Sequence, residues 1–442
     1  MRIMVDMSAT LLHKGHVRLL KEAKKIGDVV VGLTNDDEIF LQKGYHPEIP
    51  FSDRKEILEA LNSVDEVVET PWLITDKVLE KFNIDVLLHG EDNQNQVNPV
   101  YLKVVPRTQG VSSHEIRLRA QESLVSIANY KKLLTPGPGR LLSANLRGLV
   151  PCYGDGDDAY NELETRVLDK LKHMSGHTNI VPMQGADSLA LEVAFLNFIQ
   201  GRCLIIDSGH QSKRLIYFAN ELLTNSKISQ LEIIKLEELE DVGGSFDWIA
   251  GVYTEKSAAL KNDISVFKKI CETVGAKLFI DATGSMGLED RHELADVICY
   301  SSCGGLLGLT GASFVAFNEQ PQNEISSFTL SLDTYSKKKC AGPYHSIASL
   351  DHVLENHGNV RLSIEEAKRK FMSDYKGIIC RPHQQQPNLC TMVYGEIVAK
   401  DDPVILFQPH DCVQGTSILC HLGEASISGI PCNDVLDKIQ FK

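Results

Sequence analysis

Residues 1–34 decide the fold of the first part of the chain; they read MRIMVDMSATLLHKGHVRLLKEAKKIGDVVVGLT. The apolar run Ile3–Met7 predicts a short strand, and the spacing of apolar residues over 17–26 predicts an amphipathic helix. The β-branched run at 28–34 predicts a strand buried in a parallel sheet. Two histidines, His13 and His16, lie between the first strand and the helix.

The alternation of strand and helix patterns continues to about residue 118. Helices are predicted at 52–61, where Ser52 suits the N-cap position, and at 76–83; strands are predicted at 64–69, 84–90 and 102–106. This rhythm predicts an α/β, Rossmann-like, doubly wound parallel sheet. Ligands of such sheets bind beyond the carboxyl ends of the strands, where the sequence places His13, His16, the 34–37 loop, His89–Asp92 and Arg107.

Composition excludes several classes of protein. The formal net charge of −14 argues against a nucleic-acid binder that works by general electrostatics. The 11 cysteines have no CxxC pairing, which indicates reduced thiols and not a disulfide framework. We see no signal-peptide pattern and no apolar run long enough to cross a membrane, so we expect a cytoplasmic protein that does not bind membranes.

The remainder of the chain reads as a second α/β domain. Two prolines and two glycines interrupt the pattern at LLTPGPGRLLS (133–143), after a predicted linker helix at 119–132. We therefore expect domains at 1–118 and 133–442, the second with a smaller C-terminal subdomain after about residue 325. Its predicted strands are 202–209, 248–254, 276–285 and 295–302.

The histidine pair has three interpretations. Residues three apart on a helix share a face, so two metal ligands are feasible, but a catalytic zinc needs a third ligand, for which His89 is a candidate. The pair could also be two surface histidines. In the third interpretation, Gly15 lets the backbone approach an anion at the helix N-terminus, and the imidazoles act on a reacting phosphate.

A second anion-binding element favours the phosphate interpretation. PRTQGVSSHEIR (106–117) presents an arginine, a threonine, a glycine and two serines before another helix, which suits a triphosphate. Lys43 and Arg54 follow the second strand and could face the same cleft. Phosphoryl chemistry needs positive donors placed around the reacting phosphate, and these elements supply them.

The two motifs LLHKGH and RTQGVSS resemble the HxGH and RTxGxS(T/S) signatures of the cytidylyltransferases, and the resemblance covers residues 1–118. It extends to glycerol-3-phosphate cytidylyltransferases and, through MSATLLHKGHVRLL and LLHGEDNQN, to the cytidylyltransferase half of the bifunctional fosfomycin-pathway enzyme. It implies attack of a phosphate or phosphonate oxygen on the α-phosphorus of CTP, with Mg²⁺ bound to the nucleotide and loss of pyrophosphate. Thr10 stands where the glycerol-phosphate enzymes have an aspartate, which weakens glycerol phosphate as the acceptor.

The resemblance also implies the roles of individual residues. The catalytic residues would be His13, His16, Lys43 and Arg107. Lys43 and Arg54 would bind the phosphonate. The nucleotide would be bound by Ser8, Ala9, Gly15, Asp92, Thr108, Gly110, Ser112 and Ser113.

The second domain resembles class V aminotransferases of PLP fold type I, the 2-aminoethylphosphonate–pyruvate transaminases among them, through LLTPGPG (133–139). The resemblance implies that 184–195 grips the cofactor phosphate and that Asp281 pairs with the pyridine nitrogen. Gly304 stands at the position of the Schiff-base lysine, and Ile418 stands at the position of the carboxylate-binding arginine. PLP transamination requires that lysine amine, so we expect a degenerate site without covalently bound PLP.

Together these patterns predict a cytidylyltransferase that forms a CMP-phosphonate from 2-aminoethylphosphonate or 2-hydroxyethylphosphonate. The second domain would act as a scaffold or a ligand-binding module, and the chain would form a homodimer. The alternatives are an active 2-aminoethylphosphonate transaminase with a displaced lysine and a nucleotide-sensing first domain, and a cytidylyltransferase for glycerol 3-phosphate or phosphoethanolamine. A non-catalytic regulatory protein is a further alternative, but it would require the first domain to be inactive although both of its motifs are intact.

Overall fold

The computed structural model describes residues 1–91, 93–106, 108–137, 139, 141–149, 151–400, 404–422 and 439–442. The chain divides into Met1–Leu124 and Val125–Lys442, which we call unit 1 and unit 2 and describe separately. The helix predicted at 119–132 falls partly within a longer helix, α5 (Ser113–Ala128), which contains the boundary between the units. Within the described ranges, no helix is both long and apolar enough to span a bilayer.

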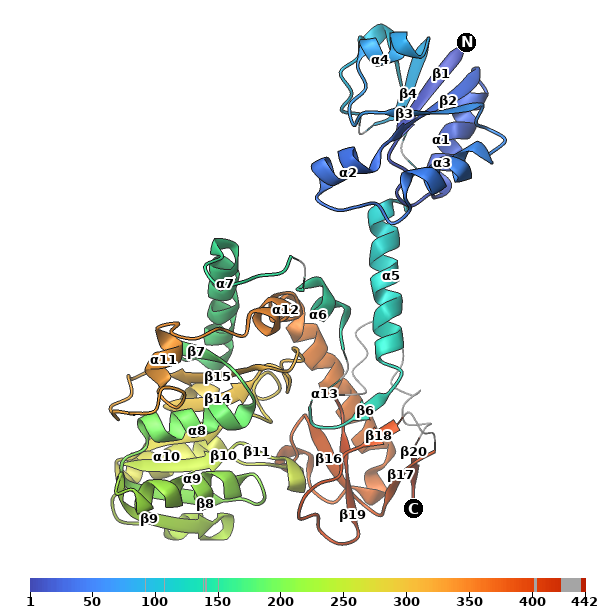
Figure 1. Cartoon of the computed structure of the whole chain (residues 1–442). Helices are drawn as coiled ribbons and strands as arrows, with labels where there is room; N and C mark the ends of the chain where they lie inside the picture. Colours follow the sequence, from blue (N-terminus) through green and yellow to red (C-terminus); the bar gives the residue numbers. More distant parts are fainter. Residues whose placement is uncertain are drawn as a thin grey trace. The chain divides into compact units, whose positions relative to one another are not determined.

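Unit 1 is built on a five-stranded parallel sheet with the order β3-β2-β1-β4-β5; β1 to β4 are labelled in Figure 1. Its strands are β1 Arg2–Met7, β2 Asp28–Thr34, β3 Glu66–Thr70, β4 Val86–Gly90 and β5 Leu102–Val105. Besides α5, its helices are α1 Lys14–Lys24, α2 Asp36–Lys43, α3 Phe51–Glu59 and α4 Asp76–Lys81. The strand order reverses between β1 and β4, and doubly wound sheets bind their ligands at such a switch point. The predicted Rossmann-like fold is confirmed.

Helices cover both faces of this sheet, which explains why its strands are apolar on both sides. Leu20 of α1 and Leu58 of α3 belong to one apolar cluster with alternate residues of β1, such as Ile3 and Val5. Leu79 of α4 joins Met4 in a second cluster. The side chains of β1 therefore alternate between two buried surfaces. The polar residues of the site follow directly after the carboxyl end of this strand.

Two local predictions for unit 1 need correction. Helix α2 lies where we expected a loop after the second strand; it starts at Asn35, whose side chain accepts a hydrogen bond from the amide of Glu38. Ser52 does not cap α3. The helix starts one residue earlier, after Pro50, and the Ser52 hydroxyl donates instead to the carboxylate of Asp53.

Unit 2 contains a seven-stranded sheet with the order β7-β15-β14-β13-β10-β8-β9. Its strands are β7 Asn179–Gln184, β8 Gly201–Asp207, β9 Ile228–Lys235, β10 Trp248–Val252, β13 Lys277–Asp281, β14 Val297–Ser301 and β15 Ala312–Phe317. Strand β15 runs antiparallel to both of its neighbours, and the other pairings are parallel. Among the helices that contribute to its two apolar cores are α7 Asp158–Ser175, α8 Asp187–Phe198, α9 Ser212–Thr224, α10 Ile264–Val274 and α12 Tyr344–Glu355.

Two helices, α8 and α9, cover one face of this sheet, and α7, α10 and α12 cover the other (Figure 1). Both cores are continuous sets of fully buried aliphatic and aromatic side chains, as expected for a sheet enclosed between helical layers. The carboxyl ends of β8, β10 and β13 therefore meet at one edge of the sheet, which is where the degenerate cofactor site is expected.

The other elements of unit 2 are mostly short, apart from the long helix α13 in its last part. The remaining helices are α6 Ser143–Arg147, α11 Leu332–Ser336 and α13 His357–Asp374. The remaining strands are β6 Lys132–Leu134, β11 Thr254–Glu255, β12 Leu260–Lys261, β16 Cys390–Tyr394, β17 Ile397–Ala399, β18 Val404–Leu406, β19 Thr416–Cys420 and β20 Ile439–Phe441. Strand β6, at the beginning of unit 2, pairs in parallel with β18, so the start of unit 2 is part of its C-terminal layer.

Candidate active site

His13 and His16 stack on each other at the start of α1. Their ring centroids are 3.9 Å apart, with an angle of 26° between the ring planes. His13 is the N-cap, and its Nδ1 accepts a hydrogen bond from the amide of Gly15 at 3.1 Å. In return, Nδ1 of His16 accepts from the amide of His13 at 3.3 Å. The first turn of α1 carries no acidic side chain, so the positive end of the helix is left available for an anion.

These hydrogen bonds fix the chemical form of both rings. Because each Nδ1 is an acceptor, a neutral imidazole at either position carries its proton on Nε2. Burial, together with the neighbouring His13 and Lys43, lowers the pKa of His16 from 6.5 to about 4. At neutral pH His16 is therefore an uncharged hydrogen-bond donor, a form suited to stabilising a negatively charged transition state.

The lowered pKa of His16 predicts an acid-sensitive unit 1. Between about pH 6.5 and 4 the unfolded chain binds a proton that the folded chain lacks, so unit 1 loses stability as the pH falls through this window. We expect His16→Gln to be less sensitive than the parent chain to a change from about pH 7.5 to 5. Urea unfolding followed by Trp72 fluorescence in a Trp248→Phe background measures this, because the chain has 2 tryptophans. An equal loss in both proteins would contradict it.

Gly15 is required by the ring of His13. A Cβ atom at position 15 would stand 2.9 Å from Cε1 and 3.0 Å from Nδ1 of His13. We expect Gly15→Ala to displace this ring and to lower kcat about tenfold or more, because small misplacements of catalytic groups are costly. Steady-state kinetics test this, with Lys14→Ala as the control, since Lys14 is exposed in the same turn. Unchanged kcat in Gly15→Ala would contradict the assigned role of the ring.

Ser8 and Ala9 follow β1, and Lys43 is at the end of α2; the three residues lie at the same edge of the sheet. Nζ of Lys43, the last residue of α2, lies 3.3 Å from Oγ of Ser8 and 5.1 Å from the ring centroid of Trp72. Ala9 is buried with a φ of 44°. Non-glycine residues adopt this left-handed conformation at a cost, and such strain concentrates at functional sites. Sequence reasoning missed Trp72; its only signal was a rare aromatic residue just after a strand.

The second motif lies beside the first. The hydroxyl of Ser112 accepts a hydrogen bond from the amide of Glu115 at 3.1 Å and so caps α5. Oγ of Ser113 is 3.5 Å from the carbonyl oxygen of Leu11, which precedes the histidine pair. Thr108 and Gly110, whose φ is 71°, form the turn that leads into this helix. Arg107 and Asp92 lie outside the described residues.

Arg54 is buried, with 1% of its surface exposed. Its guanidinium donates hydrogen bonds to the carbonyl oxygens of Ile49 at 2.9 Å and Thr34 at 3.0 Å, to the carbonyl oxygen of Ser8, and to the carboxylate of Asp36. These contacts tie α3 to the carboxyl ends of β1 and β2. The geometry is that of a residue that holds the site together, and direct contact with a phosphonate stays a prediction.

Arg117 of α5 is a second residue that sequence reasoning missed. Its guanidinium pairs with Glu48, donates to Oγ1 of Thr10 at 3.2 Å and lies 4.7 Å from the ring centroid of Tyr45. Hydrogen bonding to Glu48 raises the pKa of Arg117. Thr10, at the position where related enzymes were expected to have aspartate, is thus a neutral partner of this arginine.

His89 does not join the histidine pair. Its Nε2 lies 3.7 Å from Oδ2 of Asp6, and Asn95 donates to that same oxygen at 3.0 Å. Among the described residues, no group of three or more His, Cys, Asp or Glu side chains is positioned to hold a metal ion. The geometry around His13 and His16 suits phosphate chemistry better than a protein-bound zinc.

In unit 2 the position predicted for the Schiff-base lysine, Gly304, has no room for a side chain. Asp281 is fully buried at the end of β13, where its carboxylate accepts from Arg214 at 2.9 Å and from the amide of Thr283 at 2.9 Å. A Cβ atom at Gly304 would stand 2.9 Å from the carbonyl oxygen of Thr283, so no side chain can be added there without backbone movement. Ile418 is buried in β19 and belongs to the apolar core.

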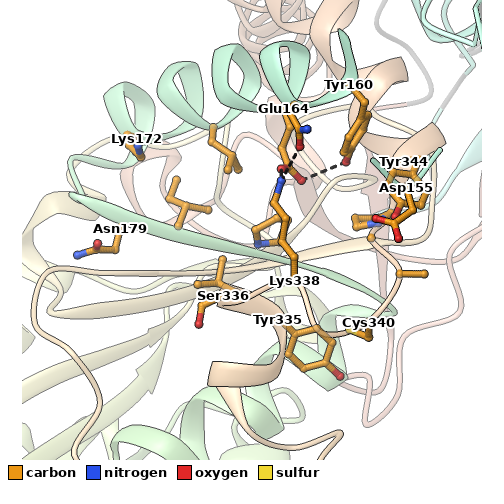
Figure 2. Close-up of a pocket in the computed structure, with 18 of the residues that line it drawn as sticks. Asp155, Tyr160, Glu164, Lys172, Asn179, Tyr335, Ser336, Lys338, Cys340 and Tyr344 are labelled. Carbon is orange, nitrogen blue, oxygen red and sulfur yellow. Dashed lines mark hydrogen bonds and ion pairs between the residues drawn. The ribbon is translucent and has the colours of Figure 1, made fainter. Parts of the chain in front are cut away.

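A cavity of about 310 Å³ lies elsewhere in unit 2, beside α7 (Figure 2). Its buried carboxylate, Glu164, accepts from the hydroxyl of Tyr160 at 3.1 Å and pairs with Nζ of Lys338 at 2.5 Å. The charge of Glu164 is therefore already balanced within the protein.

Comparisons with known proteins agree with this geometry. Residues 9–119 match the family model described as cytidylyltransferase-like. The glycerol-3-phosphate cytidylyltransferase of Bacillus subtilis is 38% identical over 115 residues, which cover 24% of this chain and 87% of that protein. The family-model match includes the positions of the histidine pair and of the motif before α5.

Unit 2 resembles a different group of proteins. A 2-aminoethylphosphonate–pyruvate transaminase of Pseudomonas aeruginosa is 26% identical over 251 residues, which cover 51% of this chain and 67% of that protein. The solved structure of an aspartate aminotransferase from Thermus thermophilus has a TM-score of 0.58 and 18% identity, and the match covers 69% of this chain and 96% of that one. This similarity confirms the predicted aminotransferase fold of unit 2.

Proposed function

The chain belongs, through residues 9–119, to the cytidylyltransferase-like family, and from this premise we propose that unit 1 transfers the cytidylyl group of CTP to a small phosphonate. Unit 1 is accordingly a nucleotidyltransferase. The acceptor is 2-aminoethylphosphonate or 2-hydroxyethylphosphonate, and the products are a CMP-phosphonate and pyrophosphate. The observation that carries the proposal is the stacked pair of His13 and His16 at the start of α1, in which each Nδ1 accepts a backbone amide, so that a neutral ring carries its proton on Nε2.

In the proposed reaction an oxygen of the phosphonate forms a bond to the α-phosphorus of CTP. The bond from that phosphorus to the oxygen bridging the α- and β-phosphates breaks, and pyrophosphate leaves with the electron pair. His13 and His16 donate hydrogen bonds to the α-phosphate as its negative charge increases, and Lys43 reaches the reacting phosphates from the end of α2. Mg²⁺ bound together with CTP would neutralise charge on the phosphates.

The nucleotide is held by both motifs. Arg107, Thr108, Ser112 and Ser113 bind its phosphates, while Gly110 and Gly15 allow close approach of the backbone. Ser8 and Ala9 lie against the nucleotide, and Asp92 approaches the base and ribose. Arg54 holds the segments that form this edge of the sheet, which is supported by its contacts with Ser8 and Thr34.

The choice of a phosphonate rests on the combination of the two units. A relative of unit 2 acts on 2-aminoethylphosphonate, as its name states, while Gly304 removes the amine that transamination requires. We therefore assign the reaction to unit 1, with unit 2 as a scaffold or ligand-binding module and the homodimer as the assembly.

A pyrophosphate-release assay tests the proposal. CTP, ATP, UTP and GTP are each combined with Mg²⁺ and with 2-aminoethylphosphonate, 2-hydroxyethylphosphonate, phosphoethanolamine or glycerol 3-phosphate. We expect turnover with CTP and a phosphonate. Turnover with glycerol 3-phosphate or phosphoethanolamine alone would sink the phosphonate assignment, and keto-acid-dependent transamination of 2-aminoethylphosphonate would show that unit 2 is active.

A further inference from the structure

Helix α2 carries Lys43 at its last position, but the helix is well anchored only at its beginning. Its first turn is capped by Asn35, and of its eight residues Ile39 alone is buried. The apolar residues that follow, Phe40 and Leu41, have 45% and 74% of their surface exposed. Burial of an apolar face is what normally fixes the position of a short helix. The placement of Lys43 therefore depends on what holds the segment after it, residues 44–50.

Arg117 of α5 holds this segment. Its guanidinium donates two hydrogen bonds to the carboxylate of Glu48, one of them at 2.7 Å, and lies 4.7 Å from the ring centroid of Tyr45. Tyr45 and Glu48 follow Lys43 by two and five positions. A further hydrogen bond joins Arg117 to Oγ1 of Thr10 at 3.2 Å, between β1 and the histidine pair. One side chain thus connects α5, the segment after α2 and the segment after β1.

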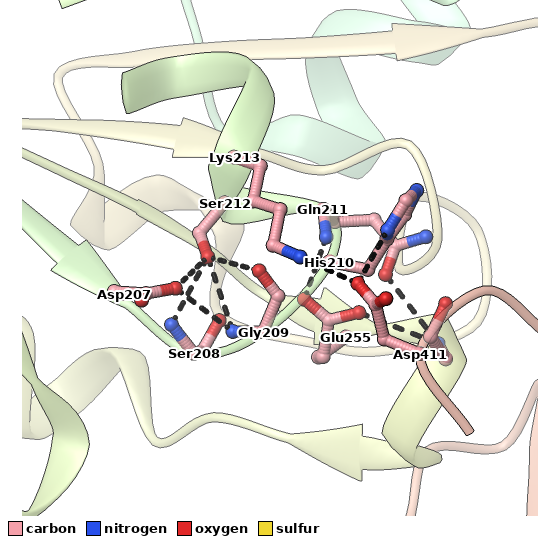
Figure 3. Close-up of polar contacts among 10 residues, drawn as sticks. Asp207, Ser208, Gly209, His210, Gln211, Ser212, Lys213, Glu255 and Asp411 are labelled. Atoms are coloured by element: carbon pink, nitrogen blue, oxygen red, sulfur yellow. Dashed lines mark hydrogen bonds and ion pairs between the residues drawn. The ribbon is translucent and has the colours of Figure 1, made fainter. Parts of the chain in front are cut away.

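The pair of Arg117 and Glu48 differs from an ordinary surface ion pair. Lys213 and Asp411 of unit 2 are an example of the ordinary kind: their charged atoms are 2.5 Å apart, but more than half of each side chain is exposed (Figure 3). Such pairs contribute little to stability, because water and salt screen them. Arg117 binds both carboxylate oxygens of Glu48 through its planar fork, and this hydrogen bonding lowers the pKa of Glu48. Glu48 is therefore charged at neutral pH and bound in a defined geometry.

Two contacts define where Lys43 is held. Its Nζ lies 3.3 Å from Oγ of Ser8, which follows β1, and 5.1 Å from the ring centroid of Trp72, which follows β3. A cation over an indole ring interacts with the electrons of that ring. The fluorescence of Trp72 is therefore a reporter of the position of Lys43.

We propose that Arg117 is a positioning residue for nucleotidyl transfer: by holding Glu48 and Tyr45 against α5, it keeps the ammonium group of Lys43 beside Ser8. The inference rests on the proposed function of unit 1, in which Lys43 reaches the reacting phosphates. Arg117 acts through Lys43 and does not itself contact the substrate. Because α5 begins with the serines of the second motif, one helix places both the phosphate-binding hydroxyls and, through Arg117, the amine.

Replacing Arg117 with methionine in the full chain tests the proposal. The background is Trp248→Phe, which leaves Trp72 as the single tryptophan, since the chain has 2. We expect kcat for pyrophosphate release to fall about tenfold and the KM for CTP to change by less than about threefold, because a misplaced reacting group mainly lowers the rate. The emission of Trp72 should shift toward that of Lys43→Met. Arg119→Met, an exposed arginine on the same helix, is the matched control and should leave both readouts unchanged.

A double variant decides whether Arg117 acts through Lys43. Adding Arg117→Met to Lys43→Met should lower kcat by no more than about twofold further, because the group that Arg117 positions is already absent. Glu48→Gln weakens the same pair from the other side and should lower kcat about threefold or more. This variant carries the test if thermal unfolding shows that Arg117→Met has lost its fold.

Values of kcat and Trp72 emission equal to those of the parent in Arg117→Met, or in Glu48→Gln if it is used, would overturn the proposal. So would a further tenfold loss in the double variant, because Arg117 would then act independently of Lys43. This outcome is separable from that of the proposed reaction. A parent chain that releases no pyrophosphate rejects the reaction, while Trp72 emission still shows whether Arg117 places Lys43. Turnover that is indifferent to Arg117 rejects only the positioning role.

Discussion

Replacing His16 with alanine is expected to lower kcat for CTP turnover by about 10²- to 10³-fold, with a smaller effect on the KM for CTP. The imidazole is uncharged at neutral pH and its Nε2–H is a donor, so its contribution is largest where charge accumulates in the transition state. Loss of a donor of this kind changes the chemical step more than the binding of the ground state.

Steady-state pyrophosphate release measures this effect, and His173→Ala is the control. His173 is an exposed histidine in the last turn of α7 in unit 2. His173→Ala therefore makes the same chemical change as His16→Ala, but away from the histidine pair. A His16→Ala protein with kcat close to that of the parent chain would remove the histidine pair from the mechanism. The thermal unfolding midpoint of each variant should be recorded as well, because His16 also accepts a hydrogen bond from the amide of His13 and so contributes to the start of α1.

Replacing Arg54 with methionine is expected to destabilise unit 1 by about 3 kcal/mol. The substitution leaves the carbonyl oxygens of Ser8, Thr34 and Ile49 without their buried donor and removes the partner of Asp36. Lys55→Met, on the exposed side of the same helix, should change stability by less than about 0.5 kcal/mol.

Urea unfolding followed by Trp72 fluorescence in the Trp248→Phe background measures both variants. A direct role of Arg54 in binding the phosphonate makes a different prediction, in which the KM for the acceptor rises while the unfolding midpoint stays the same. The experiment therefore decides between a residue that positions the site and one that contacts the substrate.

The sequence was sufficient for the fold class of both units, because runs such as 28–34 are apolar on both faces and alternate with helical patterns. It was insufficient for α2, in which Ile39 is the only buried residue, so the helix has no apolar stripe to recognise. The reversed direction of β15 was also unpredictable, since a buried strand has the same composition in either direction.

For the site, motif spacing placed His13 and His16 at the start of the first helix, but not their stacking or the role of His13 as a cap. Arg54 was predicted to bind the phosphonate, but its burial and its contacts with Ser8, Thr34 and Asp36 could not be read from the sequence, because these partners lie 18 to 46 positions away along the chain. Arg117 had no local signal, since its partner Glu48 belongs to a separate loop. Such contacts depend on the tertiary structure and not on any short pattern.

The capping arrangement at α1 has a consequence for how the site assembles. The same hydrogen bonds that start the helix also orient the two imidazoles, so fraying of the first turn and loss of catalytic geometry are a single event. Hydrogen exchange at the amides of His13 and Gly15 therefore reports directly on the fraction of molecules that are competent for catalysis. A bound nucleotide should slow both exchange rates together, because it can engage the pair only when the helix has formed.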